Sequence, residues 1–323
     1  MSISSLIING DIDNLKIHII TSDFDDNCYN KINNFATMYP NVEFFYYPLE
    51  NFNIEKYNLP DWRGSQIANA RLFFQEILGK NLDDIKNLLY LDADTLVVSA
   101  ITGLEDYQNC NIGAVIDSGK LKYFKDLGLN IYYNSGVLYI NVDNWLNNNY
   151  QDSIIKTIED NKLNLILPDQ DILNYSLGNE ITSLPLEYNM NSYEFLFKGL
   201  SSKLFFNDKI RLVSHSKVSK AKENPRILHA CGFANIKPWS NNKVNPFNEE
   251  FMKYLYGVNP MFEKEKLNGF RKVLSMNPQL LKLFLIIKNY CPENMDNFLS
   301  NIHLKLEGSQ LRHKKTYKKQ LNK

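Results

Sequence analysis

The sequence has no excess of charge of either sign. Its 323 residues contain 36 Lys or Arg and 36 Asp or Glu, so no global charge draws the chain to nucleic acid, and we expect no nucleic-acid partner. It also lacks any run of about 20 apolar residues, the length that a membrane-spanning helix needs. The opening residues, MSISSLIING, have neither the basic start nor the long apolar core of a secretory signal peptide. These absences favour a cytoplasmic protein.

Cysteine is scarce and shows no paired spacing. The four cysteines stand at positions 28, 110, 231 and 291, and none belongs to a CxxC motif. This pattern predicts reduced thiols rather than a disulfide framework or a cysteine-rich zinc site. Apolar residues make up 44% of the chain, which is enough for a sizeable core. The length is at the upper limit of one hydrophobic core and predicts one large domain with an appendage.

Short apolar segments alternate with helical patterns over the first 230 residues, which predicts an α/β domain with a mainly parallel sheet. Helices are predicted from Gly64 to Gly79, from Asn144 to about Asp160, and over DQDILNYSLG, which Gly178 ends. The predicted strands are Lys16–Thr21, Val42–Tyr47, Leu88–Leu91, Ile112–Ile116, Val137–Val142 and Arg226–His229.

The character of the chain changes after Trp239. The remainder is predicted to form short helices, including Asn277–Tyr290, and residues 261–323 carry 13 Lys or Arg but only 5 Asp or Glu. We therefore divide the chain into a main domain, 1–240, and a helical basic extension, 241–323. The extension either rests on the inner face of the cell membrane, attracted by anionic lipid, or packs as a helical cap on the main domain.

Two carboxylates interrupt the apolar segment NLLYLDADTLVVSA. Asp92 and Asp94 follow a strand that is predicted to be buried, and a buried carboxylate needs a cation or hydrogen-bond donors nearby. Ligands bind at the carboxyl ends of strands in open α/β sheets. The pair is therefore well placed to hold Mg²⁺ or Mn²⁺ against the phosphates of a nucleotide, although the same residues also suit a solvent-facing turn.

Two enzyme classes are compatible with this segment. A strand followed by D-x-D-x-T is also the first motif of haloacid-dehalogenase-type phosphatases, in which the first Asp is a nucleophile. Those enzymes need an adjacent acidic pair or a G-D-x-x-x-D motif on a later strand, and neither follows any of the later predicted strands here. Three later segments instead accompany the aspartates in order: YYNSGVLYINVDNW, LPDQDILN and HACGFANIKPW.

With these four motifs, residues 1 to about 240 resemble glycosyltransferase family 8. The resemblance implies the GT-A fold, a Rossmann-like mixed sheet that binds nucleotide-diphospho-sugars. It also implies a retaining, metal-dependent hexosyltransferase like the bacterial lipo-oligosaccharide galactosyl- and glucosyltransferases. Such an enzyme would move glucose or galactose from a UDP-sugar to a saccharide or lipid-linked acceptor of the cell envelope. A relative that binds sugar nucleotide without turnover is the alternative.

The resemblance also implies roles at the diphosphate. Asp92, Asp94 and His229 match the family's ligands for Mn²⁺ (or Mg²⁺). Gly232 would offer its backbone N–H to a phosphate, and Lys237 would place its charge on the leaving diphosphate. Four residues separate Gly232 from Lys237 here, whereas the family usually has two.

Further matches concern the donor sugar. Asn134, Ser135 and Gly136 match a turn beneath the sugar, and Arg71 and Asp117 match residues that contact its hydroxyls. Asp169 and Gln170 match the pair near the anomeric carbon. Retention would proceed by double displacement or, as we favour, by front-face attack with Gln170 shielding the oxocarbenium-like carbon.

The family's first strand has no counterpart in this sequence. Met1 falls inside the helix that follows that strand in the family, and LKIHIITSD matches the second strand. Because the first strand lies inside the sheet, we expect two strand edges to face a gap. A truncated start is our favoured explanation. The alternatives are another segment in the gap or a weakened relative.

Overall fold

Three β-sheets form the frame of this computed structural model. The structure describes residues 1–61, 65–119, 121–160, 167–207, 209–231, 236–258 and 261–290. Within them, the first sheet pairs β1 (Leu15–Thr21) with β2 (Val42–Pro48). The second has the order β3 (Asn87–Leu91), β6 (Tyr133–Asn141), β5 (Ile112–Ile116), β7 (Ile181–Leu184). The third has the order β4 (Thr95–Val97), β9 (Ile227–His229), β8 (Met190–Asn191).

The sheets are mixed rather than mainly parallel, so the expectation from the strand–helix alternation was wrong. β6 runs antiparallel to both β3 and β5, and β4 runs antiparallel to β9. The pairs β1–β2, β5–β7 and β8–β9 are parallel. A strand that is buried on both faces reads as a continuous apolar run whichever way it points, so the pattern carries no direction.

All six predicted strands are present. The largest difference is at β6, which begins at Tyr133 rather than Val137 and ends at Asn141. The Asn141 side chain accepts a hydrogen bond from the backbone N–H of Asn144 and so caps the next helix. The short strands β4, β7 and β8 were not predicted.

The helices surround these sheets. The α-helices are α1 (Ser2–Asn9), α2 (Asp26–Ala36), α3 (Phe74–Leu78), α4 (Leu121–Asp126), α5 (Val142–Asn147), α6 (Tyr150–Glu159), α7 (Pro168–Leu177), α8 (Ser192–Leu196), α9 (Gly199–Phe205), α10 (His215–Ala221), α11 (Asn248–Val258), α12 (Gly269–Met276) and α13 (Pro278–Tyr290). Short 3₁₀ helices are η1 (Leu49–Asn51), η2 (Ile54–Tyr57), η3 (Ile67–Phe73), η4 (Gly79–Leu82), η5 (Thr102–Tyr107), η6 (Gly178–Glu180) and η7 (Leu186–Tyr188).

Two of the predicted helices are divided. The start predicted at Gly64 lies outside the described residues, and the described part is the 3₁₀ helix η3 followed by α3, which Gly79 ends at φ +52°. The helix predicted from Asn144 to Asp160 is broken into α5 and α6 at Asn149, whose φ is also +52°. By contrast, α7 matches its prediction, with Pro168 in its first turn and Gly178 at its C-cap.

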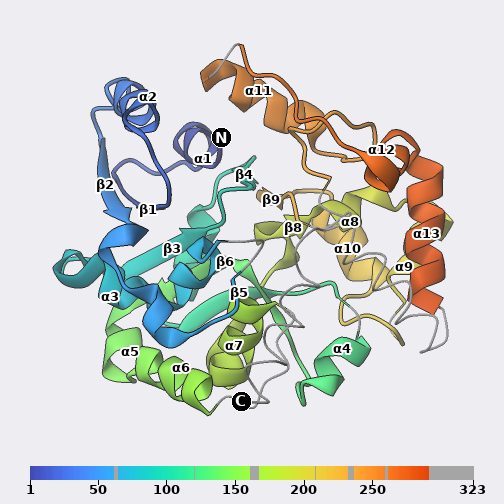
Figure 1. Cartoon of the computed structure of the whole chain (residues 1–323). Helices are drawn as coiled ribbons and strands as arrows, with labels where there is room; N and C mark the ends of the chain where they lie inside the picture. Colours follow the sequence, from blue (N-terminus) through green and yellow to red (C-terminus); the bar gives the residue numbers. More distant parts are fainter. Residues whose placement is uncertain are drawn as a thin grey trace.

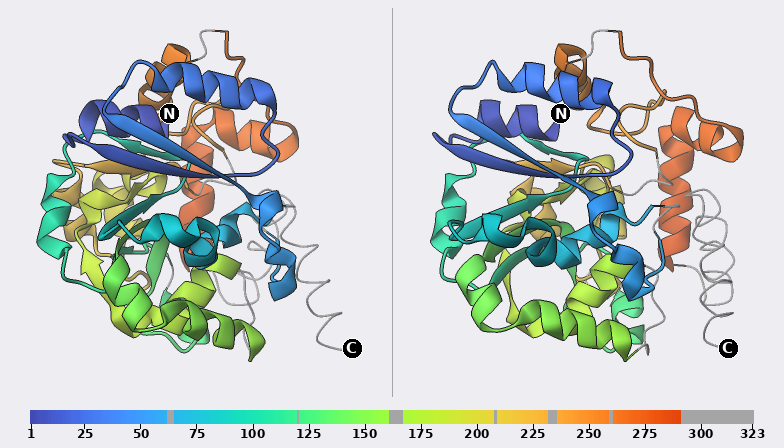
Figure 2. Two further views of the ribbon diagram at one scale, coloured as in Figure 1. Left: turned by 90° about the vertical axis from the view of Figure 1, so that its left-hand side faces the viewer. Right: turned by 60° about the vertical axis from the view of Figure 1, so that its left-hand side comes forward.

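The main core lies between the four-stranded sheet and the helices α5, α6 and α7. Trp145, Ile154, Ile172 and Leu173 pack there against sheet residues such as Ile140. Figure 2 shows these helices along the bottom of the molecule, with α1, α2 and the β1–β2 pair along the top. The carboxyl end of β3 therefore lies between two layers.

The C-terminal helices share a core with earlier residues. Leu274 of α12 and Leu281 and Leu285 of α13 belong to one buried cluster with Phe197 and Phe205. Figure 1 shows α12 and α13 beside α9 and α10, on the side away from β1 and β2. The described part of the extension thus shares a core with residues before position 240, and the boundary at residue 240 stays a prediction.

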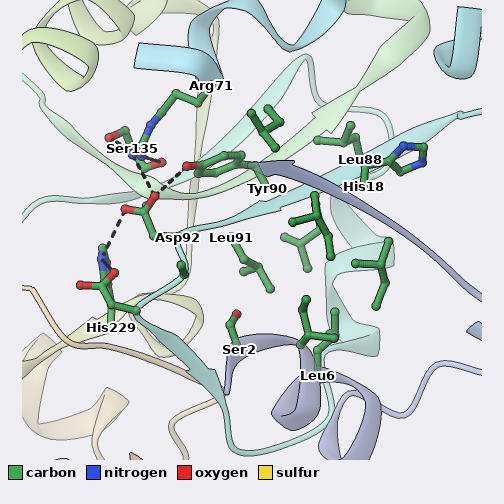
Figure 3. Close-up of a pocket in the computed structure, with 18 of the residues that line it drawn as sticks. Ser2, Leu6, His18, Arg71, Leu88, Tyr90, Leu91, Asp92, Ser135 and His229 are labelled. Carbon is green, nitrogen blue, oxygen red and sulfur yellow. Dashed lines mark hydrogen bonds and ion pairs between the residues drawn. The ribbon is translucent and has the colours of Figure 1, made fainter. Parts of the chain in front are cut away.

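A cavity of about 1820 Å³ separates the two-stranded sheet from β3. Within the described ranges, β1 pairs only with β2 and β3 pairs only with β6, and residues of both strands line this cavity. Figure 3 shows Ser2 and Leu6 of α1 on one side of it and Tyr90 and Asp92 on another. The expected gap between two strand edges is therefore present.

Candidate metal centre

The two aspartates lie in the tight connection between β3 and β4. The backbone N–H of Asp92 donates to the Gly136 carbonyl at 2.8 Å, and Thr95 closes the turn by donating its N–H and its hydroxyl to the Asp92 carbonyl at 3.0 and 2.7 Å. The Ala230 N–H donates to the Asp94 carbonyl at 2.9 Å. With their main chain fixed in this way, both carboxylates face the cavity.

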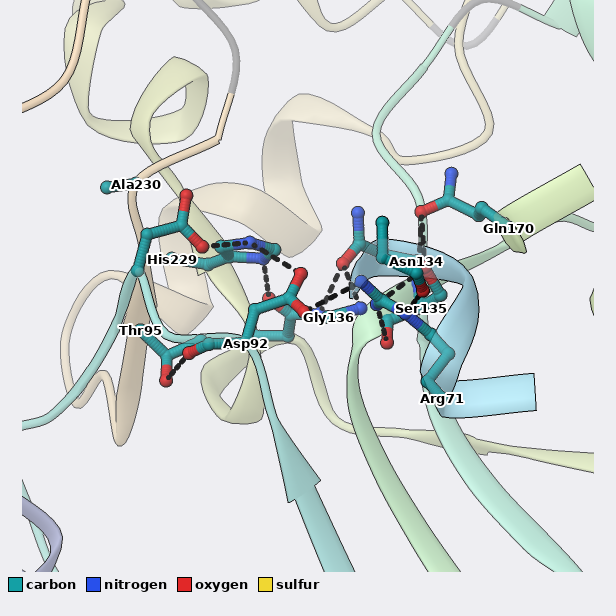
Figure 4. Close-up of polar contacts among 12 residues, drawn as sticks. Arg71, Asp92, Thr95, Asn134, Ser135, Gly136, Gln170, His229 and Ala230 are labelled. Carbon is teal, nitrogen blue, oxygen red and sulfur yellow. Dashed lines mark hydrogen bonds and ion pairs between the residues drawn. The ribbon is translucent and has the colours of Figure 1, made fainter. Parts of the chain in front are cut away.

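His229 reaches the aspartates through strand pairing. It ends β9, and its partner across the antiparallel β4–β9 ladder is Thr95, which directly follows Asp94. Its Nε2 lies 3.2 Å from Asp94 Oδ1 and 3.6 Å from Asp92 Oδ2. One ligand atom from each of the three side chains lies within 4.8 Å of the others. The predicted convergence of these residues is confirmed, and Figure 4 shows Asp92 beside His229.

The donor set fits a divalent cation. Two carboxylates and one imidazole, held close together at a cavity wall, suit Mn²⁺ or Mg²⁺ supplemented by phosphate oxygens. The site offers further room for ligands because the cavity continues past these residues. The residues therefore match the metal that the sequence predicted, while binding itself stays a prediction.

Asn189 orients the imidazole. Its Oδ1 lies 2.9 Å from His229 Nδ1, and its Nδ2 donates to Asn134 Oδ1 at 2.9 Å. Asn134 Oδ1 also accepts from the Gly136 N–H at 3.0 Å, while Asn134 Nδ2 donates to the Asp117 carboxylate. An amide oxygen only accepts, so His229 Nδ1 must carry a hydrogen. Nε2 is then the nitrogen available to a metal.

Arg71 holds the other side of Asp92. Its buried guanidinium lies 2.8 Å from Asp92 Oδ1 and 3.0 Å from Asp169 Oδ2, and it donates to the Ser135 carbonyl at 2.7 Å. The Tyr90 hydroxyl also donates to Asp92 Oδ1, at 2.7 Å. Arg71 therefore connects Asp92 of the candidate metal centre to Asp169 at the start of α7. It does not point freely into the cavity.

Burial and charge act in opposite directions on these groups. Burial alone would raise the pKa of Asp94, but Lys237 and His229 outweigh it and hold the pKa well below its ordinary value. Burial would lower the pKa of His229, but Cys231 and Asp94 raise it well above the ordinary value. For Asp169, burial prevails over the attraction of Arg71, and its pKa is raised.

The predicted donor-sugar residues surround the cluster. Gln170 Oε1 accepts from the Ser135 backbone N–H at 3.0 Å, and Gln170 Nε2 donates to Asp117 Oδ2 at 3.4 Å. Asp169, at 7% exposure, accepts from the Ser135 hydroxyl at 3.2 Å in addition to its ion pair with Arg71. All these residues line the same cavity as the aspartates. The structure thus brings Arg71 and His229, which lie 158 positions apart in the sequence, to the same cavity.

Lys237 lies at the candidate metal centre, whereas Gly232 lies outside the described residues. The Lys237 ammonium group forms an ion pair with Asp94 and donates to the Ala230 carbonyl at 2.9 Å. The longer spacing before Lys237 therefore does not keep its side chain from the site.

The backbone of Gly136 lies close to the side chains of His229 and Asp92. A Cβ at this position would lie 2.2 Å from His229 Cε1 and 2.9 Å from Asp92 Oδ2. Only a residue without a side chain leaves these two groups where they are.

The roles of Tyr90 and Asn189 were not predicted from the sequence. Tyr90 stands two positions before Asp92, and strand alternation places both on one face, so this neighbour was accessible to sequence reasoning. Asn189 directly precedes the two-residue strand β8 and has no local signal.

Comparison with known proteins agrees with this geometry. The model described as "Glycosyl transferase family 8" matches residues 1–243. The chain is 25% identical over 302 residues to a lipopolysaccharide 1,2-glucosyltransferase of Escherichia coli, with 86% of each chain covered. It is 29% identical over 180 residues to General stress protein A of Bacillus subtilis. The matched region is 54% of this chain and 59% of that protein.

A solved structure shows the same fold. The crystal structure of galactosyltransferase LgtC in complex with donor and acceptor sugar analogs matches with a TM-score of 0.61 and 22% identity, over 81% of this chain and 92% of that one. The expected GT-A fold is therefore confirmed. The family match also favours the transferase over the haloacid-dehalogenase-type phosphatase.

Proposed function

Because the chain belongs to glycosyltransferase family 8, we propose that it is a retaining, metal-dependent glycosyltransferase. It moves a hexose, glucose or galactose, from a UDP-sugar to a saccharide or lipid-linked acceptor of the cell envelope. The observation that carries this proposal is the meeting of Asp92, Asp94 and His229 at the wall of a large cavity. We propose that the protein works in the cytoplasm. That compartment would keep its cysteines reduced, as the sequence predicts.

Three side chains would hold Mn²⁺ or Mg²⁺ in this proposal: Asp92, Asp94 and His229. The bound cation would neutralise negative charge that develops on the leaving diphosphate. Lys237, already beside Asp94, would place its ammonium group on the same diphosphate and stabilise it as the sugar leaves. Gly232, which lies outside the described residues, is proposed to donate its backbone N–H there.

The donor hexose would lie over Asn134, Ser135 and Gly136. Asp117 would accept hydrogen bonds from sugar hydroxyls, since its carboxylate faces the cavity and is oriented by Asn134 at 3.0 Å. Arg71 would support this position mainly through Asp92 and Asp169, because its guanidinium is occupied by these carboxylates. The sugar would thus be placed by the same polar network that orients His229.

Retention of configuration would proceed by front-face attack. Asp169 is paired with Arg71 and with the Ser135 hydroxyl, so its carboxylate is better suited to positioning than to nucleophilic attack. Gln170, a weak nucleophile, would shield the oxocarbenium-like carbon with its amide oxygen. The leaving diphosphate would then accept the proton of the acceptor hydroxyl.

Release of UDP from UDP-glucose or UDP-galactose in the presence of Mn²⁺ tests the proposal. Wild-type protein should release UDP, and Asp94→Ala should not. Asp143→Asn, on the exposed first turn of α5, is a control that should behave like the wild type. If folded wild-type protein releases no UDP from any UDP-hexose, the transferase proposal is wrong.

Binding without turnover is the second candidate. The ion pair of Asp94 with Lys237 favours it, because a metal would have to compete with this ammonium group for the carboxylate. Calorimetry separates the two functions: Mn²⁺-dependent UDP-hexose binding with no UDP release supports a binding protein.

We also propose that the protein contacts an anionic membrane surface. Leu200 and Leu204 of α9 are exposed, as are Leu283, Ile287 and Tyr290 of α13, and the Tyr290 hydroxyl donates to the Leu204 carbonyl at 2.6 Å. The two helices therefore meet at Tyr290 and Leu204, and each carries further exposed apolar side chains. Within the described residues, no helix has the length and hydropathy to cross a bilayer.

The charge of the sequence that follows α13 supports the same proposal. Residues 291–323 continue from α13 and carry 7 Lys or Arg against 3 Asp or Glu. Each lysine near an anionic bilayer contributes about 1 kcal/mol. Co-sedimentation with phosphatidylcholine vesicles should therefore require added phosphatidylglycerol and should weaken in Leu200→Ser. Equal binding to both vesicle types, or to neither, contradicts the membrane contact.

A further inference from the structure

Asn289, in the last turn of α13, is a buried polar residue that is fully engaged. Only 6% of it is exposed. Its Oδ1 accepts hydrogen bonds from Arg211 Nε at 3.2 Å and Nη2 at 2.5 Å, and its Nδ2 donates to the Phe205 carbonyl at 2.8 Å. A buried carboxamide needs such partners, so the end of α13 is built around Arg211.

Arg211 joins this helix to a segment far away in the sequence. A further polar contact runs from Nη1 to the Ser118 carbonyl, at 2.8 Å. The guanidinium lies over the Phe205 ring, 4.2 Å from its centroid, which fixes the plane of the group. Because Nε and Nη2 both donate to Asn289, the guanidinium is oriented with Nη1 toward the Ser118 carbonyl.

Ser118 directly follows Asp117, the residue assigned to the donor sugar. Ser118 is buried, and its hydroxyl accepts from Asn191 Nδ2 at 2.6 Å. The Gly119 N–H donates back to Asp117 Oδ1 at 2.7 Å. The short segment 117–119 is therefore held from two sides, by Asn191 at the side chain of Ser118 and by Arg211 at its carbonyl.

We propose that Arg211 and Asn289 are positioning residues for donor recognition. Together they hold segment 117–119 so that the Asp117 carboxylate faces the hexose, which makes α13 part of the donor site rather than a separate cap. The proposal rests on the proposed function, in which Asp117 binds the sugar. Arg211 lines the cavity whereas Asn289 is not among its lining residues, so the Asn289 variant tests positioning alone, and its effect should appear in the recognition of the hexose and not of the nucleotide.

Calorimetry with UDP and with UDP-hexose, both in Mn²⁺, measures this effect. Asn289→Leu removes the acceptor of the fork, and Arg211→Lys keeps the charge but cannot span two carbonyl oxygens. In each variant the advantage of UDP-hexose over UDP should fall at least about tenfold, the lower end of the effect of a lost charge-assisted hydrogen bond. The affinity for UDP alone should change less than about twofold. General destabilisation would instead weaken both ligands.

Tyr290→Phe is the matched control. It removes the neighbouring hydrogen bond between α13 and α9 without touching Arg211, so the ratio of the two affinities should stay at the wild-type value. An unchanged ratio in Asn289→Leu, or an equal loss in Tyr290→Phe, overturns the proposal.

Amide hydrogen exchange tests the link without any ligand. The Gly119 amide should exchange faster in Asn289→Leu than in wild type or Tyr290→Phe, while the amides of β5 should not. If Gly119 exchange is unchanged, the positioning role is wrong whatever the donor is. If it rises but wild-type protein binds no UDP-hexose, the proposed function fails and the mechanical link stands.

Discussion

A single methyl group at Gly136 should separate the residues of the candidate metal centre. In Gly136→Ala the new Cβ would lie 2.2 Å from His229 Cε1, 2.8 Å from His229 Nδ1 and 2.9 Å from Asp92 Oδ2. His229 is 4% exposed and cannot swing into solvent. Relief of these contacts requires shifts of the order of 1 Å, whereas ligand distances at a metal tolerate only about 0.2 Å.

We expect two measurable consequences. Overpacking should lower the free energy of unfolding by about 1–3 kcal/mol, and the affinity for Mn²⁺ should fall at least about tenfold, the loss seen when the supports of metal ligands are changed. Titration followed by the electron paramagnetic resonance of free Mn²⁺ measures this affinity. Circular dichroism checks that the variant is folded.

Gly178→Ala is the matched control for this experiment. A Cβ there meets no atom within 4 Å, and its φ of −56° and ψ of −30° suit any residue. It should bind Mn²⁺ like the wild type with equal or higher stability. If Gly136→Ala binds Mn²⁺ with wild-type affinity, the three side chains do not form a common site.

Three further predictions concern charge. Arg71→Met should lower the free energy of unfolding by about 3–5 kcal/mol in urea titrations, because Asp92 and Asp169 lose a buried cation; a loss below about 1 kcal/mol would contradict this. Burial raises the pKa of Glu194 from 4.5 to about 8, so the folded state retains a proton that the unfolded state releases. Stability should therefore fall as pH rises from about 5 to about 8, and Glu194→Gln should flatten that slope, whereas an unchanged slope would refute the assignment. Mn²⁺ at 100 times its Kd should stabilise the wild type by about 2.7 kcal/mol, and it should stabilise Asp94→Asn far less. Thermal unfolding measures both gains, and equal gains would place the metal elsewhere.

The local part of the site was predictable from sequence. A buried strand that ends in Asp92 and Asp94 carries its own signal, because unpaired carboxylates are costly at such a place. His229 was not accessible in this way, since it meets Asp94 through a pairing of only three residues between β4 and β9. Its assignment came from the resemblance to a family, and the structure supplies the physical connection.

The supporting residues could not be predicted. Asn189, Arg211 and Asn289 act through side-chain hydrogen bonds across 40 to 93 positions, and neither periodicity nor turn chemistry encodes such contacts. The direction of β6 could not be predicted either, because a strand buried on both faces has the same apolar pattern whichever way it runs. What sequence patterns specify is which face of an element is buried, and long-range pairing decides the rest.

The central claim is that Asp92, Asp94 and His229 bind one divalent cation together. Anomalous diffraction from a crystal of the protein grown with Mn²⁺ and UDP tests it most directly. We expect a single manganese peak bounded by these three side chains, with His229 contributing Nε2. A manganese ion bound elsewhere, or full occupancy of UDP with no manganese between the three residues, would contradict it.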